Sequence, residues 1–362
     1  MRVLVMTVVH HPEDARILHR EIASLTAAGH AVVYAAPFSA RDVSPRDGLE
    51  GVDLPRSAGR NRLGAVKAAR AAYRRLRDEV DITVLHDPEL LLAVAGAHRG
   101  RPVVWDVHED TAAALGMKAW LPRPARVPLA GAVRLAESVA ERSVHLMLAE
   151  HGYVDRFRRP HPVVPNQTLV PAQVPPPGAD RAVYLGAITL ERGAAEMVAV
   201  ARRLAPEGVR VELIGGADAA ATPLLEQAVA DGVLDWAGFQ PNDAALARLP
   251  GALAGLSLLT DQPNYRHSMP TKVIEYMAHG LPVVTTPNPP AADLVTRHEC
   301  GTVVGWDDPA AAAAAVLRLR DDAERRLAYG RRGHEAALAE HDWRTAGETF
   351  VAQLEAWARA GS

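Results

Sequence analysis

Short apolar runs alternate with helix-like segments along almost the whole chain, and this pattern limits the fold more than any other feature. The runs at 3–9, 31–36 and 82–85 are almost entirely apolar, as strands buried on both faces of a sheet are. Segments with helical spacing separate them, and repeated strand–helix–strand units build parallel sheets covered by helices. We also expect a short strand at Val163 and Val164. The sequence therefore predicts an α/β fold.

The alternation occurs twice, on either side of a segment with five prolines at 165–179. Prolines at this density are typical of a linker. We therefore predict a Rossmann-like domain at 1–164, a second domain at 180–342, and a final helix, within 343–362, that packs back against the first domain. Neither half has a G-x-G-x-x-G motif after a strand, which argues against a dinucleotide cofactor.

Composition excludes several classes of function. The chain has 362 residues and a formal net charge of −3, which gives no electrostatic case for a nucleic-acid partner. Its single cysteine, Cys300, cannot form an internal disulfide and fits a reducing compartment. No apolar run approaches the roughly 20 residues that span a bilayer, and no signal-peptide pattern precedes the first strand. We expect a cytoplasmic protein.

The segment 267–284 contains the strongest candidate for a binding site, because it reads as a loop, a short helix and a strand. We expect Thr271 to cap the helix and Gly280 to end it in a left-handed conformation. Lys272 and Glu275 are three residues apart, on one side of the first turn. Lys272 is also one of only three lysines in the chain. A cation, a carboxylate and free N–H groups at a helix N-terminus suit a diphosphate and a ribose, and a solvated lysine is the alternative.

Polar residues follow the strands of the first half, where open α/β sheets place their ligands. A metal held by Asp106, His108 and Asp110 is one alternative, but alternate residues in a strand-end loop more often contact a ligand or water, and we predict no metal. Asp87 and Glu89 alternatively cap the helix that begins at 90. The candidate residues are His10, His11, Asp14, Arg16, His86, Asp87, Glu89, Asp106, His108 and Glu109.

The segment 116–134 mixes basic and apolar side chains. This composition fits a weak peripheral contact with a membrane, or a cover over an acceptor site. A loop and helix with a purely structural role is the alternative. Pro122 and Pro124 argue against a long amphipathic helix before Pro128.

Three regions resemble retaining glycosyltransferases of the GT-B fold, specifically family 4 (glycosyl transferases group 1). Residues 185–193, Leu-Gly-Ala-Ile-Thr-Leu-Glu-Arg-Gly, resemble the family's strand, glycine turn and phosphate loop. Residues 267–284 resemble its E-x7-E region and the following Gly-x-Pro-Val-Val. The polar segments 14–17, 86–89 and 106–109 are similar to a subgroup common in polysaccharide assembly. The resemblance covers nearly the whole chain and implies two Rossmann-like domains with parallel sheets facing a central cleft.

The resemblance also implies roles for individual residues. Glu275 matches a glutamate that binds the donor ribose, Arg192 and Lys272 are expected at the diphosphate, and His108 near the reacting sugar. We therefore expect His108, Arg192 and Lys272 to be catalytic. The family's first glutamate is replaced by His267, and an arginine after the first glycine by Ala187. The expected donor site comprises Gly186, Arg192, Gly216, Phe239, Gln240, His267, Ser268, Met269, Thr271, Lys272 and Glu275.

The resemblance implies a retaining glycosyltransferase that moves a sugar from a nucleotide-diphosphate donor to an acceptor. The acceptor belongs to cell-surface polysaccharide or natural-product biosynthesis, and the nucleotide sugar is a co-substrate, with no cofactor. One alternative is a catalytically silent paralogue that binds a nucleotide sugar or a partner enzyme, which the changes at His267 and Ala187 support. The other is a sugar-nucleotide epimerase of the same fold.

Overall fold

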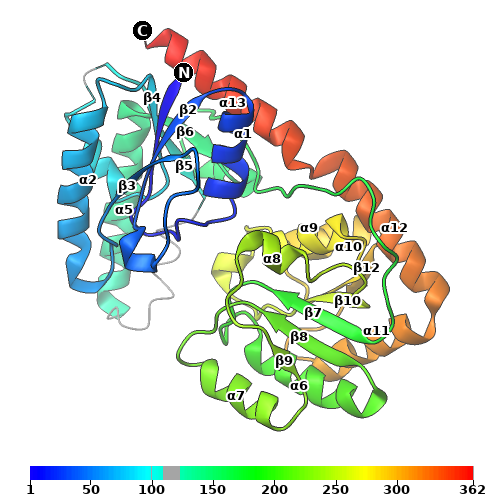
Figure 1. Ribbon diagram of the computed structural model, residues 1–362. Coiled ribbons are helices and arrows are strands. Elements are labelled where there is room, and N and C mark those ends of the chain that lie inside the picture. Colours follow the sequence, from blue (N-terminus) through cyan, green and yellow to red (C-terminus); the bar gives the residue numbers. More distant parts are fainter. Residues whose placement is uncertain (99, 109–122, 362) are drawn as a thin grey trace. The chain divides into compact units, whose positions relative to one another are not determined.

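The chain folds into two compact units, which the computed structural model describes over residues 1–98, 100–108 and 123–361 (Figure 1). Unit 1 consists of Met1–Asn166 together with Arg344–Ser362, and unit 2 of Gln167–Trp343. Each unit contains a six-stranded sheet in which all strand pairs are parallel. The predicted α/β fold with two Rossmann-like sheets is confirmed.

The two sheets share one topology. Strands follow the order β3-β2-β1-β4-β5-β6 in unit 1 and β9-β8-β7-β10-β11-β12 in unit 2. The order therefore reverses between β1 and β4, and again between β7 and β10, and ligands of open α/β sheets bind at such reversals. The strands are β1 (Arg2–Met6), β2 (Ala31–Ala36), β3 (Glu50–Asp53), β4 (Ile82–Leu85), β5 (Val103–Val107), β6 (His145–Leu148), β7 (Arg181–Leu185), β8 (Arg210–Ile214), β9 (Asp235–Trp236), β10 (Ala254–Ser257), β11 (Val283–Thr285) and β12 (Gly301–Val303).

Two predictions about strands were wrong or incomplete. The edge strand β3 was not predicted, because it is largely exposed and its sequence, Glu-Gly-Val-Asp, has no apolar pattern. Val163 and Val164 were predicted to form a strand, but Val163 makes only an isolated bridge with Leu148. Pro162 and Pro165 flank this pair, and a proline cannot donate a ladder hydrogen bond.

Helices cover both sheets, and two of them, α5 (Arg123–Ser143) and α13 (Trp343–Ala360), correspond to segments for which the sequence analysis made a prediction. The prolines were expected to exclude a long helix before Pro128, but α5 begins at Arg123. Pro124 is compatible with this start because it lies in the first turn, where N–H groups have no intrahelical partner. No helix in the described ranges is both long and apolar enough to cross a membrane. The helices are α1 (Ala23–Ala27), α2 (Arg62–Leu76), α3 (Leu90–Val94), α5 (Arg123–Ser143), α6 (Ala194–Leu204), α7 (Thr222–Ala230), α8 (Asn242–Leu246), α9 (Thr271–Ala278), α10 (Pro289–Arg297), α11 (Pro309–Asp321), α12 (Ala323–Glu340) and α13 (Trp343–Ala360).

The last helix, α13, packs against the beginning of unit 1, and Figure 1 marks both chain ends at the same end of this unit. One ring nitrogen of His30 lies 3.2 Å from the amino group of Met1, and the other lies 3.1 Å from a carboxylate oxygen of Glu355. The rings of His145 and Trp357 stack with centroids 4.7 Å apart. These contacts join α13 to β2 and β6 of unit 1.

Gly193, which precedes α6, offers a test of the packing in unit 2. Its φ is +87°, and a Cβ placed there would lie 1.9 Å from the carbonyl oxygen of Leu258. Gly208 has a similar φ of +75° with no atom within 4 Å of such a Cβ. We expect Gly208→Ala to lower the free energy of unfolding by about 1–2 kcal/mol, and Gly193→Ala to lower it by roughly a further 2 kcal/mol because of the clash. Urea unfolding followed by circular dichroism measures both values, and equal losses would contradict the packing described here.

Candidate functional site

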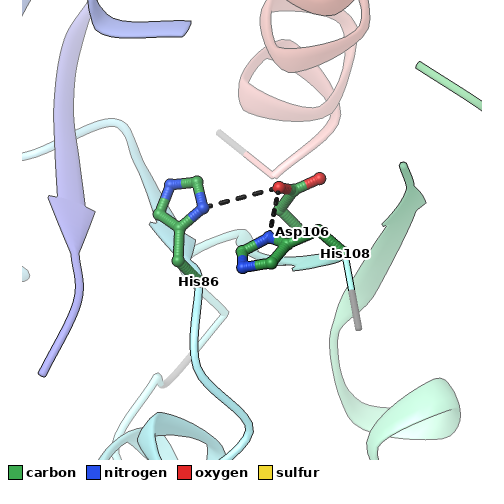
Figure 2. Close-up of side chains that lie close together, drawn as sticks. All are labelled: His86, Asp106 and His108. Carbon is green, nitrogen blue, oxygen red and sulfur yellow. Dashed lines mark hydrogen bonds and ion pairs between the residues drawn. The ribbon is translucent and has the colours of Figure 1, made fainter. Parts of the chain in front are cut away.

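Imidazole and carboxylate side chains gather at the carboxyl ends of β1, β4 and β5 in unit 1. Figure 2 shows that one carboxylate oxygen of Asp106, in β5, interacts with the imidazoles of both His86 and His108. This oxygen lies 3.0 Å from Nδ1 of His108 and 3.4 Å from Nδ1 of His86. Nε2 of His108 lies 2.8 Å from Nε2 of His10, in the loop after β1. The structure thus brings four predicted residues from three strand ends into one hydrogen-bonded group.

Asp106 is held by Arg16 through two hydrogen bonds. Nε and a terminal nitrogen of Arg16 each lie 2.8 Å from one of the two carboxylate oxygens, and Arg16 also donates to the carbonyl of Val164 at 3.1 Å. Both side chains are buried. Burial alone would raise the pKa of Asp106, but the charge of Arg16 and the hydrogen bonds from His108 and His86 hold it well below its usual value. Asp106 is therefore ionised, and it fixes the orientation of both imidazoles.

Glu21 completes the group, although the sequence analysis did not select it. Its side chain is fully buried, with one oxygen 2.8 Å from Nε of Arg16 and the other 3.4 Å from Nε2 of His86. Burial and then the charge of Asp106 raise the pKa of Glu21 well above its usual value, although Arg16 opposes this. Ionisation of Glu21 is therefore disfavoured, and Asp106 is the main counter-charge of Arg16.

A π-helix explains why Glu21 was missed. Residues Ile17–Ile22 form this helix, in which the N–H of Glu21 donates to the carbonyl of Arg16, five residues earlier, at 2.9 Å. Its wider turn brings both side chains to the same side, whereas an α-helix separates positions five apart. The one sequence feature that indicated Glu21 is its position as a carboxylate among the apolar residues of this segment.

Asp87, which follows β4, binds the loop after β1 through hydrogen bonds. One of its oxygens accepts hydrogen bonds from the hydroxyl of Thr7 at 2.9 Å and from the N–H groups of Val8 and Val9 at 2.5 and 3.1 Å. Its other oxygen lies 3.3 Å from Nε2 of His10. Asp87 is buried and its side chain does not cap α3, so it holds the loop that carries His10.

The remaining acceptor-side candidates lie around this group or outside the described residues. Asp14 accepts from the N–H of Arg16 at 2.9 Å, and His11 from the N–H of Glu13 at 3.1 Å, within the same loop. Glu89 does not cap α3 with its side chain, which faces the hydroxyl of Ser57 at 3.2 Å and a nitrogen of Arg62 at 2.9 Å. Glu109 and the rest of the segment 109–122, which includes the first seven residues of the proposed membrane-facing stretch, lie outside the described residues.

His86, Asp106 and His108 also have the spacing of a metal site, because one ligand atom from each lies within 4.8 Å of the others. A metal would need an oxygen of Asp106, and both oxygens already accept from Arg16 at 2.8 Å. The guanidinium is a permanent cation in the position where the metal charge would act. The donor set therefore suits a hydrogen-bonded network better than a metal ion.

In unit 2, predicted donor residues gather at the reversal between β7 and β10. Gly186 follows β7, and a Cβ placed on it would lie 3.6 Å from Cε and 3.8 Å from Nζ of Lys272, in the first turn of α9. The ammonium also lies 5.0 Å from the centre of the Tyr184 ring, a residue that the sequence analysis did not select. Lys272 and Glu275 are both buried, 6% and 8% exposed, so neither is the solvated side chain of the alternative reading.

The ammonium of Lys272 is in an unfavourable electrostatic position. Burial and, to a smaller extent, the charge of Arg192 lower its pKa to about 7, and Glu275 only partly opposes these effects. Arg192 ends the loop between β7 and α6, where its N–H donates to the carbonyl of Thr189 at 3.1 Å. Two cations held close together, one of them buried, form a site that an anion would stabilise.

The start of α9 differs in one respect from the expectation. Thr271 was predicted to cap the helix, but Pro270 occupies the N-cap position and no side chain caps it, because proline has no side-chain oxygen. The left-handed conformation at Gly280 is confirmed, with φ +69°. Ser268 is half-buried, and Met269 packs against the core of unit 2. His267 is exposed.

The other predicted donor residues lie after β8 and β9. Phe239 is 58% exposed, and a Cβ placed on Gly216 would lie 3.8 Å from its Cβ. The side-chain amide of Gln240 donates to the carbonyl of Ala237 at 2.8 Å. An exposed aromatic ring beside a glycine leaves a flat apolar surface at this strand end.

Replacement of Asp106 tests the buried network. We expect Asp106→Asn to lower the free energy of unfolding by about 3–5 kcal/mol, because Arg16 would remain buried without its counter-charge. The matched control is Asp261→Asn, which removes an exposed carboxylate that Arg266 binds through two nitrogens, and we expect a loss below about 1 kcal/mol. Urea unfolding at pH 7 gives both values. Similar losses in the two variants would show that the Arg16 pair does not stabilise unit 1.

Comparison with known proteins agrees with this geometry. Residues 179–322, nearly the whole of unit 2, match the model of the family Glycosyl transferases group 1. No curated protein matches the chain significantly in sequence.

Several solved structures are similar over the full length. Sucrose-phosphate synthase of Thermosynechococcus elongatus is 16% identical with a TM-score of 0.74, covering 100% of this chain and 99% of that one. HepE of Anabaena, solved in complex with UDP-glucose, is 14% identical with a TM-score of 0.71, covering 98% and 100%. AviGT4, a glycosyltransferase involved in avilamycin A biosynthesis, is 18% identical with a TM-score of 0.63, covering 100% and 98%. The chain therefore has the GT-B fold, and its residues 179–322 match the family Glycosyl transferases group 1.

Proposed function

We propose that the protein is a retaining glycosyltransferase that binds a nucleotide-diphosphate sugar at the β7–β10 reversal of unit 2 and contacts the acceptor through unit 1. The buried ammonium of Lys272 beside Arg192, within the group 1 domain, carries this proposal. The similarity to HepE, which was solved with UDP-glucose, supports the donor class. The similarity to AviGT4, a glycosyltransferase, favours an active enzyme over a silent paralogue.

The diphosphate of the donor supplies the negative charge that this site lacks. Lys272 and Arg192 bind the phosphate oxygens, together with N–H groups at the uncapped start of α9. Glu275, one turn further along α9, accepts hydrogen bonds from the vicinal hydroxyls of the ribose. Phe239, which is exposed after β9, provides a flat surface near the base.

During transfer, the bond between the anomeric carbon and the β-phosphate oxygen breaks, the acceptor oxygen bonds to the same carbon, and the acceptor proton passes to the departing phosphate oxygen. Negative charge grows on the departing diphosphate. Lys272 and Arg192 are already in place to stabilise that charge, which lowers the barrier without reorganisation. We propose that these two cations make a divalent metal unnecessary.

On the acceptor side, His108 and His10 are proposed to contact the acceptor. Asp106 fixes the Nδ1 side of His108, which leaves its Nε2 edge facing His10. Arg16, Asp106 and Glu21 are buried and act as positioning residues through His108 and His86.

The donor assignment is tested with Glu275→Gln. We expect this change to weaken binding of the preferred nucleoside diphosphate at least tenfold, about 1.4 kcal/mol, because an amide loses the charge that attracts two hydroxyl donors. Titration calorimetry with UDP, GDP and dTDP measures the effect, with Glu226→Gln on the exposed face of α7 as the control. Release of nucleotide from the matching sugar donor should persist in EDTA. Unchanged affinity for the best nucleotide would refute the assignment of Glu275.

A second prediction follows from the pKa of Lys272, about 7 in the folded chain. This is below its unfolded value, so the unfolded chain binds more protons above pH 7 and the contribution of Lys272 to stability rises with pH up to about 10.5. A bound diphosphate restores the ammonium, and nucleotide affinity should therefore fall by up to about tenfold per pH unit between pH 7 and 9.

Calorimetry in two buffers of different ionisation enthalpy detects the proton taken up on binding. In Lys272→Arg the cation does not titrate in this range, and in Lys272→Met there is none, so both variants should show flat pH profiles. An equally flat profile in the unmodified protein would show that Lys272 does not contact the phosphates.

A further inference from the structure

A hollow of about 540 Å³ lies at the amino ends of β5 and β6 in unit 1. The acceptor-side residues occupy the carboxyl ends of the same sheet, so the two regions are separated by the length of β5, which runs from Val103 in the hollow to Val107 beside His108. Four segments line the hollow: residues 98 and 100–103 at the start of β5, 141–146 entering β6, the loop 159–162, and the last turns of α13. A volume of this size accommodates a small molecule.

The lining is positively charged in a chain that is negative overall. It contains three arginines, Arg101, Arg142 and Arg159, and one carboxylate, that of Glu141. Its formal charge is therefore +2 when the imidazoles are counted as neutral. The whole chain carries −3. His98, His145 and His161 also line the hollow and add further donors. An anion is therefore the occupant that this lining attracts.

The single carboxylate is already committed to the backbone. One oxygen of Glu141 accepts from the N–H groups of Arg158 and Arg159, each at 2.8 Å, and lies 3.1 Å from Nε2 of His161. Glu141 is buried and orders the 158–161 loop. Within the described ranges, the guanidinium groups of Arg101, Arg142 and Arg159 have no ion pair or hydrogen bond, in contrast to the nearby Arg156, which binds Glu137 at 2.6 Å. Three guanidinium groups thus remain available on one concave surface.

An aromatic wall accompanies these cations. The rings of His145 and Trp357 are stacked, with centroids 4.7 Å apart and an angle of 17° between their planes. Both residues line the hollow. Such a wall favours an organic molecule over a bare inorganic ion, while guanidinium groups match the geometry of phosphate oxygens.

We propose that this hollow binds a small phosphorylated organic molecule through Arg101, Arg142 and Arg159. The site is separate from the proposed donor and acceptor residues, and it does not depend on the proposed function. A phosphate could also come from a lipid headgroup. The concave shape and the last turns of α13 along its side favour a soluble ligand.

Arginine labelling with phenylglyoxal, mapped by mass spectrometry on the unmodified protein, tests the proposal at each residue. We expect 10 mM ribose 5-phosphate to slow labelling of the three arginines at least threefold. Arg74 and Arg75, which are exposed on α2, serve as internal controls and should label at unchanged rates. Equal effects at both sets, or no protection, would overturn the proposal.

Calorimetry in an Arg192→Gln background, where the proposed donor site is weakened, provides the second measurement. We expect Arg142→Gln/Arg159→Gln to weaken binding of ribose 5-phosphate at least tenfold, and the matched pair Arg74→Gln/Arg75→Gln to change it less than twofold. Both pairs are exposed, so neither should affect folding. Similar losses would overturn the assignment. Vesicles of phosphatidylglycerol form the last arm, and protection of the three arginines by vesicles but not by ribose 5-phosphate would refute a soluble ligand.

Discussion

The buried ion pair between Arg16 and Asp106 is the interaction on which the acceptor-side region of unit 1 depends. It joins the loop after β1 to the end of β5, and through the carbonyl of Val164 to the segment after β6. A buried pair of this kind contributes little net stability over an apolar replacement, but it defines a unique arrangement because any displacement leaves a charge unpaired. His86 and His108 take their orientations from the same carboxylate.

The reversal of strand order holds buried carboxylates in unit 1 and a buried cation in unit 2. At the β1–β4 reversal, the buried carboxylates of Asp87 and Asp106 are fully satisfied by donors from the chain itself. At the β7–β10 reversal, the buried Lys272 lies near a second cation, and its charge is only partly balanced by Glu275. The two carboxylates of the first region are therefore balanced within the chain, whereas an anion would stabilise the second region.

The sequence predicted most of the fold and the neighbourhood of both sites, because both rest on local patterns. Buried central strands are apolar on both faces, and the polar residues that end β4 and β5 are neighbours by topology. Glu21 was not predicted because it lies in a π-helix. The number of residues per turn there differs from that of an α-helix, on which the sequence analysis relied. The prediction that Thr271 caps α9 was wrong because Thr271 is already the first residue of the helix, and Pro270 occupies the N-cap position.

Features assembled from distant segments were beyond prediction for a different reason. Arg101, Arg142 and Arg159 follow no common periodicity, and only the folded sheet and α13 bring them to one concave surface. Similarly, Tyr184 looks like an ordinary strand residue until α9 places Lys272 over its ring. Such juxtapositions arise from tertiary packing, which short-range sequence patterns do not encode.

The path of the chain has a consequence for synthesis on the ribosome. Unit 2 is a continuous stretch, Gln167–Trp343, and all of it can fold as soon as it has left the exit tunnel. Most of unit 1 is translated before unit 2, yet α13, which packs on His30 and His145, is translated after it. Unit 1 thus remains without one wall until unit 2 has been made, and its basic hollow is complete only then.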